Sequence, residues 1–374
     1  MTVVTGAEVG TVERSAPRRR QRRLPLHAVL LLPGAVALLA GIDAALLLME
    51  VPAPVSTERL PVVHGPLMVL GFLGTLVSLE RAVALRRRVG FLAPALLGSG
   101  GVLLLSPAPL PIGQWLLVGG AGALALTYVP LWRRQRDDAV LVQALGAVAA
   151  GGGALLWTAG LGVPDLLPWL CGFVVLTIAG ERLELARFAM GPSAGTVLVL
   201  AASAYAGCLV ATLLWPAVGH PLLGVVVLGL VGWLFTHDVA RRTVRSTGLA
   251  RFAAVGMLAG YGWLVVAGAL WLVGTPTGAA YDAVVHAVFL GFTMSMVMAH
   301  APVILPAVLR QPLPWHPAMY GPLVLLHASL ALRLWVGDAL GSSAAWRTGG
   351  VLNIVALLSF VAVAVWVSRR GRRP

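Results

Sequence analysis

Two histidines, His64 and His286, each lie in an apolar stretch long enough to span a bilayer. An imidazole inside hydrocarbon is costly, and it usually faces a cofactor, a polar partner or water. If both stretches run inward from the outer face, the rise of a helix puts His64 about 5 Å and His286 about 10 Å below that face. Two imidazoles at similar depth on different helices are what a bis-histidine haem needs. The alternative is two separate interfacial histidines that only form hydrogen bonds.

Two charged residues could support such a site. Asp282 precedes His286 by one helical turn, where a carboxylate could orient the second ring nitrogen of the histidine. Arg333 falls in the outer half of a later apolar stretch and could pair with a haem propionate. Its alternative is to extend along the helix to the outer surface.

A second pair of histidines lies deeper. His300 follows His286 by fourteen residues, which puts it on nearly the same helix face and about 21 Å further in. His327, in the next apolar stretch, is expected at a similar depth. The two could bind copper, or they could relay protons as a polar site without metal.

The apolar stretch that ends near Phe188 carries Glu181 and Arg182 close to its inner end. Charges within the membrane usually serve a function. The alternative is an ordinary helix end, with Glu184 and Arg187 in a local ion pair. Asp238 ends another stretch and is expected to be solvated.

The composition defines the class of protein. The chain has 374 residues, of which 59% are hydrophobic and 11% charged, and its mean hydropathy is +0.89. These values predict an all-α integral membrane protein in contact with the lipid bilayer. The net charge of +13 does not indicate nucleic-acid binding, because the arginines cluster at the ends of apolar stretches. We expect a disordered basic tail over residues 1–23, a transmembrane domain over 24–368 and a basic tail over 369–374.

Apolar runs of roughly 20 residues predict about twelve transmembrane helices. Their approximate ranges are 25–49, 61–84, 89–109, 112–132, 139–160, 165–187, 195–215, 219–240, 251–274, 280–306, 317–337 and 346–368. The loops after even-numbered helices are rich in arginine, whereas those after odd-numbered helices are nearly free of it. The positive-inside rule therefore predicts that both termini are cytoplasmic.

The chain resembles the NnrS proteins, which are haem- and copper-containing membrane proteins linked to nitric oxide metabolism and distantly related to subunit I of the haem–copper oxidases. The resemblance covers most of the chain in layout. It rests on short motifs: His64-Gly65, Gly180-Glu181-Arg182, the segment YDAVVHAVFLGFTMSMVMAH at 281–300 and the segment RFAAVGMLAGYGWLVVAGALW at 251–271.

The resemblance implies a haem–copper-oxidase-like bundle in which a b-type haem lies between His64 and His286, near the outer face. Other parts of that family's active site are missing. The predicted sixth and seventh helices contain no histidine, which removes the three-histidine copper site. Val284 stands where the ligand of a second haem would be. Proton-pumping oxygen reduction is therefore not expected.

The expected function is that of a haem-binding protein in a bacterial-type plasma membrane. It would act on nitric oxide or respond to it, with a redox partner that the sequence does not define. The alternative is a secondary transporter whose pathway is lined by Glu181, Arg182, His300 and His327.

Overall fold

The computed structural model describes residues 26–309 and 311–371, and within these ranges it contains helices and no strands. The predicted tail at residues 1–23 and the end of the tail predicted at 369–374 lie outside the described residues. The all-helical fold class predicted from composition is confirmed for the described part of the chain.

The helices follow one another with short connections. In chain order they are α1 (Leu26–Leu48), α2 (Arg59–Pro66), η1 (Leu67–Leu73), α3 (Gly74–Leu85), η2 (Arg88–Phe91), α4 (Leu92–Leu104), α5 (Leu110–Gln135), α6 (Asp138–Thr158), α7 (Val163–Met190), α8 (Ala194–Leu214), α9 (Pro216–His237), α10 (Ala240–Thr243), α11 (Gly248–Val273), α12 (Gly278–His286), η3 (Ala287–Met294), α13 (Ser295–Leu309), η4 (Pro317–Met319), α14 (Tyr320–Ala331), η5 (Leu332–Ala339) and α15 (Ser343–Arg370).

Several of these segments join into continuous passes. Among the described residues, eleven helices are long and apolar enough to cross a membrane, and a shorter apolar helix spans Arg88–Leu104. The elements α2, η1 and α3 form one pass, as do α12, η3 and α13, and α14 continues into η5. The passes match the twelve stretches predicted from the sequence, with most ends within a few residues. The chain is thus built as a multi-pass membrane protein.

Three passes change their hydrogen-bonding pattern partway along. The segments η1, η3 and η5 are π-helices, in which each turn takes one residue more than in an α-helix. η1 begins three residues after His64, η3 begins directly after His286, and η5 contains Arg333. π-Helical turns are rare and often occur at functional sites.

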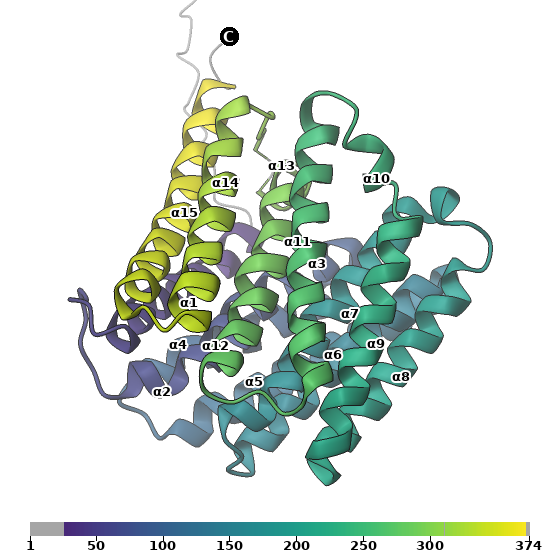
Figure 1. Ribbon diagram of the computed structural model, residues 1–374. Coiled ribbons are helices and arrows are strands. Elements are labelled where there is room, and N and C mark those ends of the chain that lie inside the picture. The colour runs from purple at the N-terminus through teal and green to yellow at the C-terminus, as the bar shows by residue number, and fades with distance from the viewer. Residues whose placement is uncertain (1–25, 310, 372–374) are drawn as a thin grey trace, which may run out of the picture.

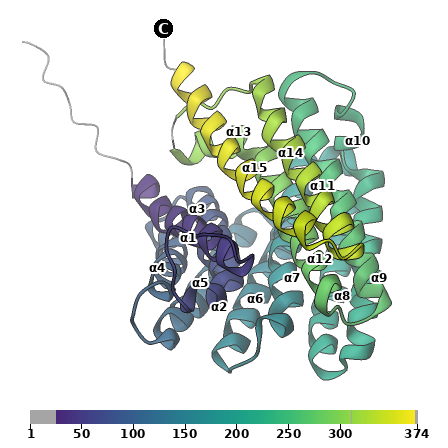
Figure 2. The ribbon, with the colours of Figure 1, turned by 60° about the vertical axis from the view of Figure 1, so that its left-hand side comes forward.

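Helix α7 lies at the centre of the bundle and is the most buried of the eleven long passes. In Figure 2, α1 to α5 gather on one side of it and α8, α9 and α11 on the other. In Figure 1, α8 and α9 form the edge of the molecule opposite α15.

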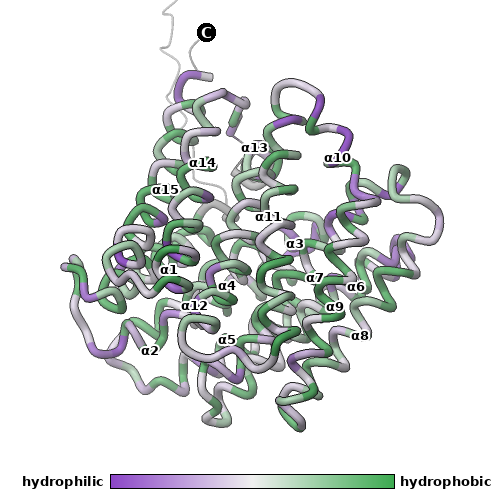
Figure 3. The backbone as a smooth tube through the Cα atoms, in the orientation of Figure 1, coloured by the Kyte–Doolittle hydropathy of each residue, from purple (hydrophilic) through white to green (hydrophobic). Residues whose placement is uncertain are grey.

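The distribution of hydropathy fits a protein surrounded by lipid. In Figure 3, hydrophilic residues gather at the end of the bundle that carries α10 and the last turn of α15, while apolar residues cover much of the helix sides. Many of the large apolar side chains are exposed, including Leu126, Leu200 and Val225. A soluble protein rarely exposes so many apolar side chains, so the lipid is their natural environment.

Glycines bring some of the passes into backbone contact. A Cβ atom at Gly180 of α7 would lie 2.7 Å from the carbonyl oxygen of Ala139 in α6, and one at Gly146 of α6 would lie 3.0 Å from the carbonyl oxygen of Phe173. Small residues at facing positions are the usual means by which membrane helices approach closely. This contact fixes α6 against α7.

Candidate functional site: two stacked cavities

Two cavities, of about 420 and 410 Å³, lie end to end between the same five passes, and Arg333 of a sixth pass also lines the first. On α7 the first is lined by residues 163–170 and the second by residues 174–182, and on α15 the ranges are 346–357 and 357–361. We call the first the His64–His286 cavity and the second the Glu80–His300 cavity. Both are lined by Phe72, Leu73, Met294 and Leu357. The two cavities are therefore adjacent in one column through the bundle, and these four side chains form the wall that they share.

His64 reaches the first cavity from α2. Its Nδ1 lies 3.0 Å from the carbonyl oxygen of Gly41 in α1. A carbonyl can only accept a hydrogen bond, so Nδ1 carries the proton and donates it. The lone pair of the ring is then on Nε2. None of the hydrogen bonds found among the described residues involves this nitrogen.

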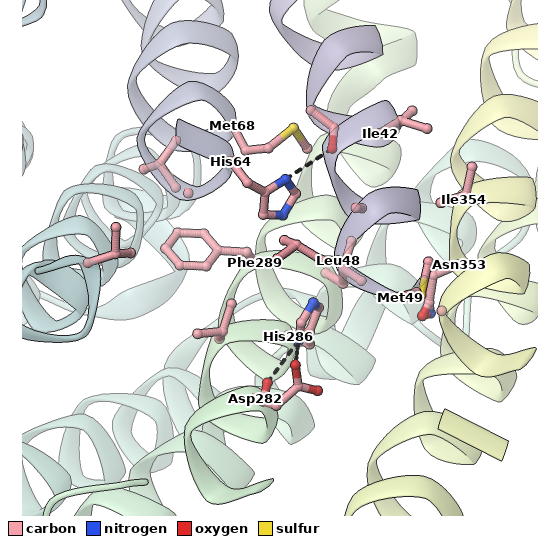
Figure 4. Close-up of a pocket in the computed structure, with 18 of the residues that line it drawn as sticks. Ile42, Leu48, Met49, His64, Met68, Asp282, His286, Phe289, Asn353 and Ile354 are labelled. Carbon is pink, nitrogen blue, oxygen red and sulfur yellow. Dashed lines mark hydrogen bonds and ion pairs between the residues drawn. The ribbon is translucent and has the colours of Figure 1, made fainter. Parts of the chain in front are cut away.

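His286 has the same arrangement on the opposite wall. Its Nδ1 lies 2.9 Å from the carbonyl oxygen of Asp282 and 3.2 Å from Asp282 Oδ1, so it too donates. Figure 4 shows the two rings pointing into the cavity from its two sides, with their remaining nitrogens facing one another. The structure thus brings the two predicted ligands together, each with a nitrogen lone pair free to bind a metal.

Asp282 is held by an ion pair. Arg333 donates through Nε to Oδ2 at 3.0 Å and through Nη2 to Oδ1 at 2.8 Å, and Trp346 donates to Oδ2 at 3.2 Å. The guanidinium group also lies 4.6 Å from the centre of the Trp346 ring. Arg333 is 6% exposed, so it does not extend to the surface. The expected role of Asp282 in orienting His286 fits this geometry.

The Glu80–His300 cavity has its own polar network. Arg182 donates to Asp238 through Nε at 2.8 Å and through Nη2 at 2.9 Å, and Tyr261 donates to the same carboxylate at 2.6 Å. Arg182 Nη1 lies 3.2 Å from His300 Nε2. His300 Nδ1 lies 2.8 Å from the carbonyl oxygen of Met296 and must donate to it, so Nε2 accepts from Arg182.

The expectation that Asp238 is solvated is wrong, because it is 1% exposed. It lies just beyond the end of α9, where it also accepts a hydrogen bond from the backbone N–H of Ala240. Burial alone would raise its pKa. The hydrogen bonds and charge of Arg182, together with the hydrogen bond from Tyr261, outweigh burial and hold the pKa below its ordinary value.

A second cluster surrounds Arg81. Its Nη2 lies 2.6 Å from Glu80, and its Nη1 lies 3.0 Å from both Glu184 and Gln143. Glu181 meets this cluster only at 3.8 Å, through Arg81 Nη2. The local pair of Glu184 with Arg187 is not formed, because Arg187 bonds Asp137 instead. The three carboxylates around Arg81 come from two passes, α3 and α7.

His327 does not join His300 by any contact found in the described part of the chain. Trp263 donates from Nε1 to His327 Nδ1 at 2.9 Å, and Ser295 Oγ lies 3.4 Å from the other ring nitrogen. His327 lines neither of the two cavities. In both His300 and His327, therefore, the ring lone pair already accepts a hydrogen bond. Among the described residues, no group of three or more His, Cys, Asp and Glu side chains is placed to hold a metal ion.

Sequence reasoning missed Trp346 and Met49, and it favoured an ordinary helix end for Glu80 and Arg81. Trp346 and Met49 line the first cavity beside Arg333, and Glu80 lines the second. Arg81 anchors the carboxylate cluster next to it. A signal existed for Asp238: a buried arginine such as Arg182 needs a counter-ion within the bundle. Which carboxylate would supply it depends on which passes are neighbours.

The chain belongs to the family described as "Domain of unknown function (DUF8744)", whose match covers residues 23–369. A comparison with curated proteins finds no match.

Proposed function

We propose that this chain is a haem-binding redox protein of the membrane, related in role to the NnrS proteins of nitric oxide metabolism. The observation that supports it is the matched pair of His64 and His286. Both rings donate from Nδ1 to a carbonyl oxygen, and both direct a free Nε2 into one cavity. Two facing imidazole lone pairs are the donor set of a bis-histidine haem.

The remaining lining fits such a group. Apart from the two histidines, Asp282, Arg333 and a few other polar side chains, the walls are aliphatic and aromatic, as cofactor cavities generally are. Haem b, when bound, would supply one-electron chemistry at its iron. His64 and His286 would bind the iron, and neither would need to break a hydrogen bond to do so.

Asp282 and Arg333 would tune this site. Asp282 accepts a hydrogen bond from Nδ1 of His286, which fixes the tautomer of the ring and makes its Nε2 a more basic ligand for a metal. Arg333 balances the carboxylate charge, and its Nη1 points to the sulfur of Met49 at 3.8 Å. That nitrogen is the one available to a propionate.

With His64 and His286 both holding the iron, the haem would have no open site for oxygen or nitric oxide. The proposed role is electron transfer, or sensing of nitric oxide by release of one histidine. Copper at His300 and His327 would require both rings to give up their present hydrogen bonds.

The absorption spectrum of protein purified after haem-replete expression tests the proposal. We expect a low-spin b-type spectrum with sharp visible bands on reduction. His64→Ala and His286→Ala should give high-spin iron or lose the haem. His220→Ala is the matched control, since His220 is also buried and bonded through Nδ1 to a carbonyl but lines neither cavity. A colourless wild-type protein would refute the proposal.

A secondary transporter is the second candidate. The column of two adjacent cavities, with Glu181, Arg182 and His300 lining the second, favours it. It predicts colourless protein and uptake of a solute into proteoliposomes that Glu181→Gln reduces. The spectrum of the wild-type protein distinguishes the two candidates.

A further inference from the structure

The Glu80–His300 cavity combines an apolar channel with a polar end. Its walls are aliphatic side chains from α1 and α15, among them Leu39, Leu358 and Val361. These three are 59%, 44% and 49% exposed, so the cavity reaches the outer, lipid-facing surface of the bundle at these two helices. A long apolar chain dissolved in the membrane could enter it there.

The polar end offers unused hydrogen-bonding groups. Glu181 lines the cavity, and its one polar side-chain contact among the described residues is the 3.8 Å approach to Arg81. A carboxylate in the membrane interior without closer partners is costly. It can accept a hydrogen bond from a hydroxyl group of a ligand. Arg182 Nη1 gives one hydrogen to His300 and has a second to offer to a carbonyl oxygen.

The charge balance disfavours anionic head groups. The two networks at this end contain the four carboxylates of Glu80, Glu181, Glu184 and Asp238 but only the two guanidinium groups of Arg81 and Arg182. A phosphate or a fatty-acid carboxylate would meet net repulsion. A neutral head group that both donates from hydroxyls and accepts at carbonyls matches the groups present.

The Glu80–His300 cavity lies next to the His64–His286 cavity, which favours a redox-active ligand. Phe72, Leu73, Met294 and Leu357 line both cavities, so a ligand at the inner end of the His64–His286 cavity is separated from the second cavity only by these side chains. We propose that the Glu80–His300 cavity binds a membrane quinol or quinone, with its ring between Glu181 and Arg182 and its apolar tail along α1 and α15.

The binding site itself does not depend on haem, but electron delivery rests on the proposed function. Oxidation of one quinol breaks two O–H bonds and releases two protons and two electrons. A haem held by His64 and His286 would supply a one-electron acceptor, so the two electrons would leave the quinol one at a time, the second after a one-electron acceptor protein has reoxidised the site, and both protons would pass to water. Glu181 is the group placed to accept the first proton.

Equilibrium binding of decylubiquinol, kept reduced under anaerobic conditions, to the detergent-purified full chain tests the site by titration calorimetry. We expect Glu181→Gln to weaken binding by at least about tenfold, because a quinol hydroxyl donates to the carboxylate and a hydrogen bond to a charged group contributes about 1.5–3 kcal/mol. Glu184→Gln is the matched control, because Glu184 shares the contact with Arg81 but does not line the cavity. Ala35→Trp, at the exposed rim on α1, should block the channel, whereas Leu200→Trp on the lipid-facing side of α8 should not.

Equal affinities of wild type and Glu181→Gln, or no binding by folded wild-type protein, would overturn the proposal. So would displacement of decylubiquinol by phosphatidylglycerol at similar concentration, since it would identify the cavity as a lipid site. The colour of the wild-type protein separates the two proposals. Colourless wild-type protein that binds decylubiquinol supports this site and refutes the haem, and red wild-type protein that does not bind decylubiquinol does the reverse.

Discussion

The losses of stability caused by replacing Arg333 and by replacing Asp282 should be strongly non-additive, because the two side chains form an ion pair. Replacing Arg333 with Met removes two hydrogen bonds and leaves a carboxylate, 22% exposed, without its counter-ion among apolar walls. Breaking one partner of a buried pair costs about 3–5 kcal/mol. The partial exposure of Asp282 places the expected cost near 3 kcal/mol. Replacing both partners, as in Asp282→Asn with Arg333→Met, should recover all but about 1 kcal/mol of this loss.

The assay is reversible unfolding of haem-free protein in mixed micelles with increasing SDS, followed by far-ultraviolet circular dichroism. Arg347→Met is the matched control, because Arg347 pairs with Glu50 but is 48% exposed on its side chain, and such pairs contribute below about 1 kcal/mol. The reasoning fails if Arg333→Met costs no more than Arg347→Met, or if the two single losses simply add in the double variant.

Three further predictions follow from other parts of the molecule. Gly180→Ala should destabilise the protein by about 1–3 kcal/mol because its Cβ would lie 2.7 Å from a backbone oxygen of α6, whereas Gly207→Ala, with open space around it, should be neutral in the same unfolding assay. The pKa of Asp238 is below its ordinary value in the folded state, so its contribution to stability is present at neutral pH and is lost as the pH falls below about 4. When unfolding is measured at decreasing pH, Asp238→Asn should therefore lose less stability between neutral and acid pH than the wild type does. A reporter active only in the cytoplasm, fused after Pro374, should give signal; signal from a periplasmic reporter instead would refute the helix count behind the positive-inside argument.

The ranges of the membrane-spanning helices could be predicted, because each helix is determined by its own stretch of sequence. An apolar run of membrane length must form a helix, since lipid offers no partner for backbone polar groups. That His64 and His286 face one another could be predicted only in part. Depth along a helix follows from residue counting, but the rotation of each helix depends on its neighbours. The π-helical turns η1 and η3, which the sequence did not indicate, lie next to these histidines.

The Arg81 and Arg182 networks show where prediction from one sequence stops. Arg182 finds Asp238, and Arg81 finds Glu184, each on another pass. Local spacing favoured pairs within one helix, such as Glu184 with Arg187. The observed pairs form because α3, α6, α7 and the end of α9 meet at one depth, and no local pattern encodes that meeting.

The hydrogen bonds of the four membrane histidines show that the two cavities differ in the chemistry that they offer. His64 and His286 donate from Nδ1 and keep a lone pair for a ligand, whereas His300 and His327 use their lone pairs to accept hydrogen bonds. The first cavity therefore has two ring nitrogens with free lone pairs and a balanced ion pair, while the second has carboxylates that can take up protons. Electrons released by a quinol in the second cavity would cross the wall that the two cavities share, whereas its protons would stay on the side of the second cavity. If the two proposals hold, a variant such as Leu73→Trp at this wall should slow reduction of haem by quinol while leaving the affinity for each group nearly unchanged.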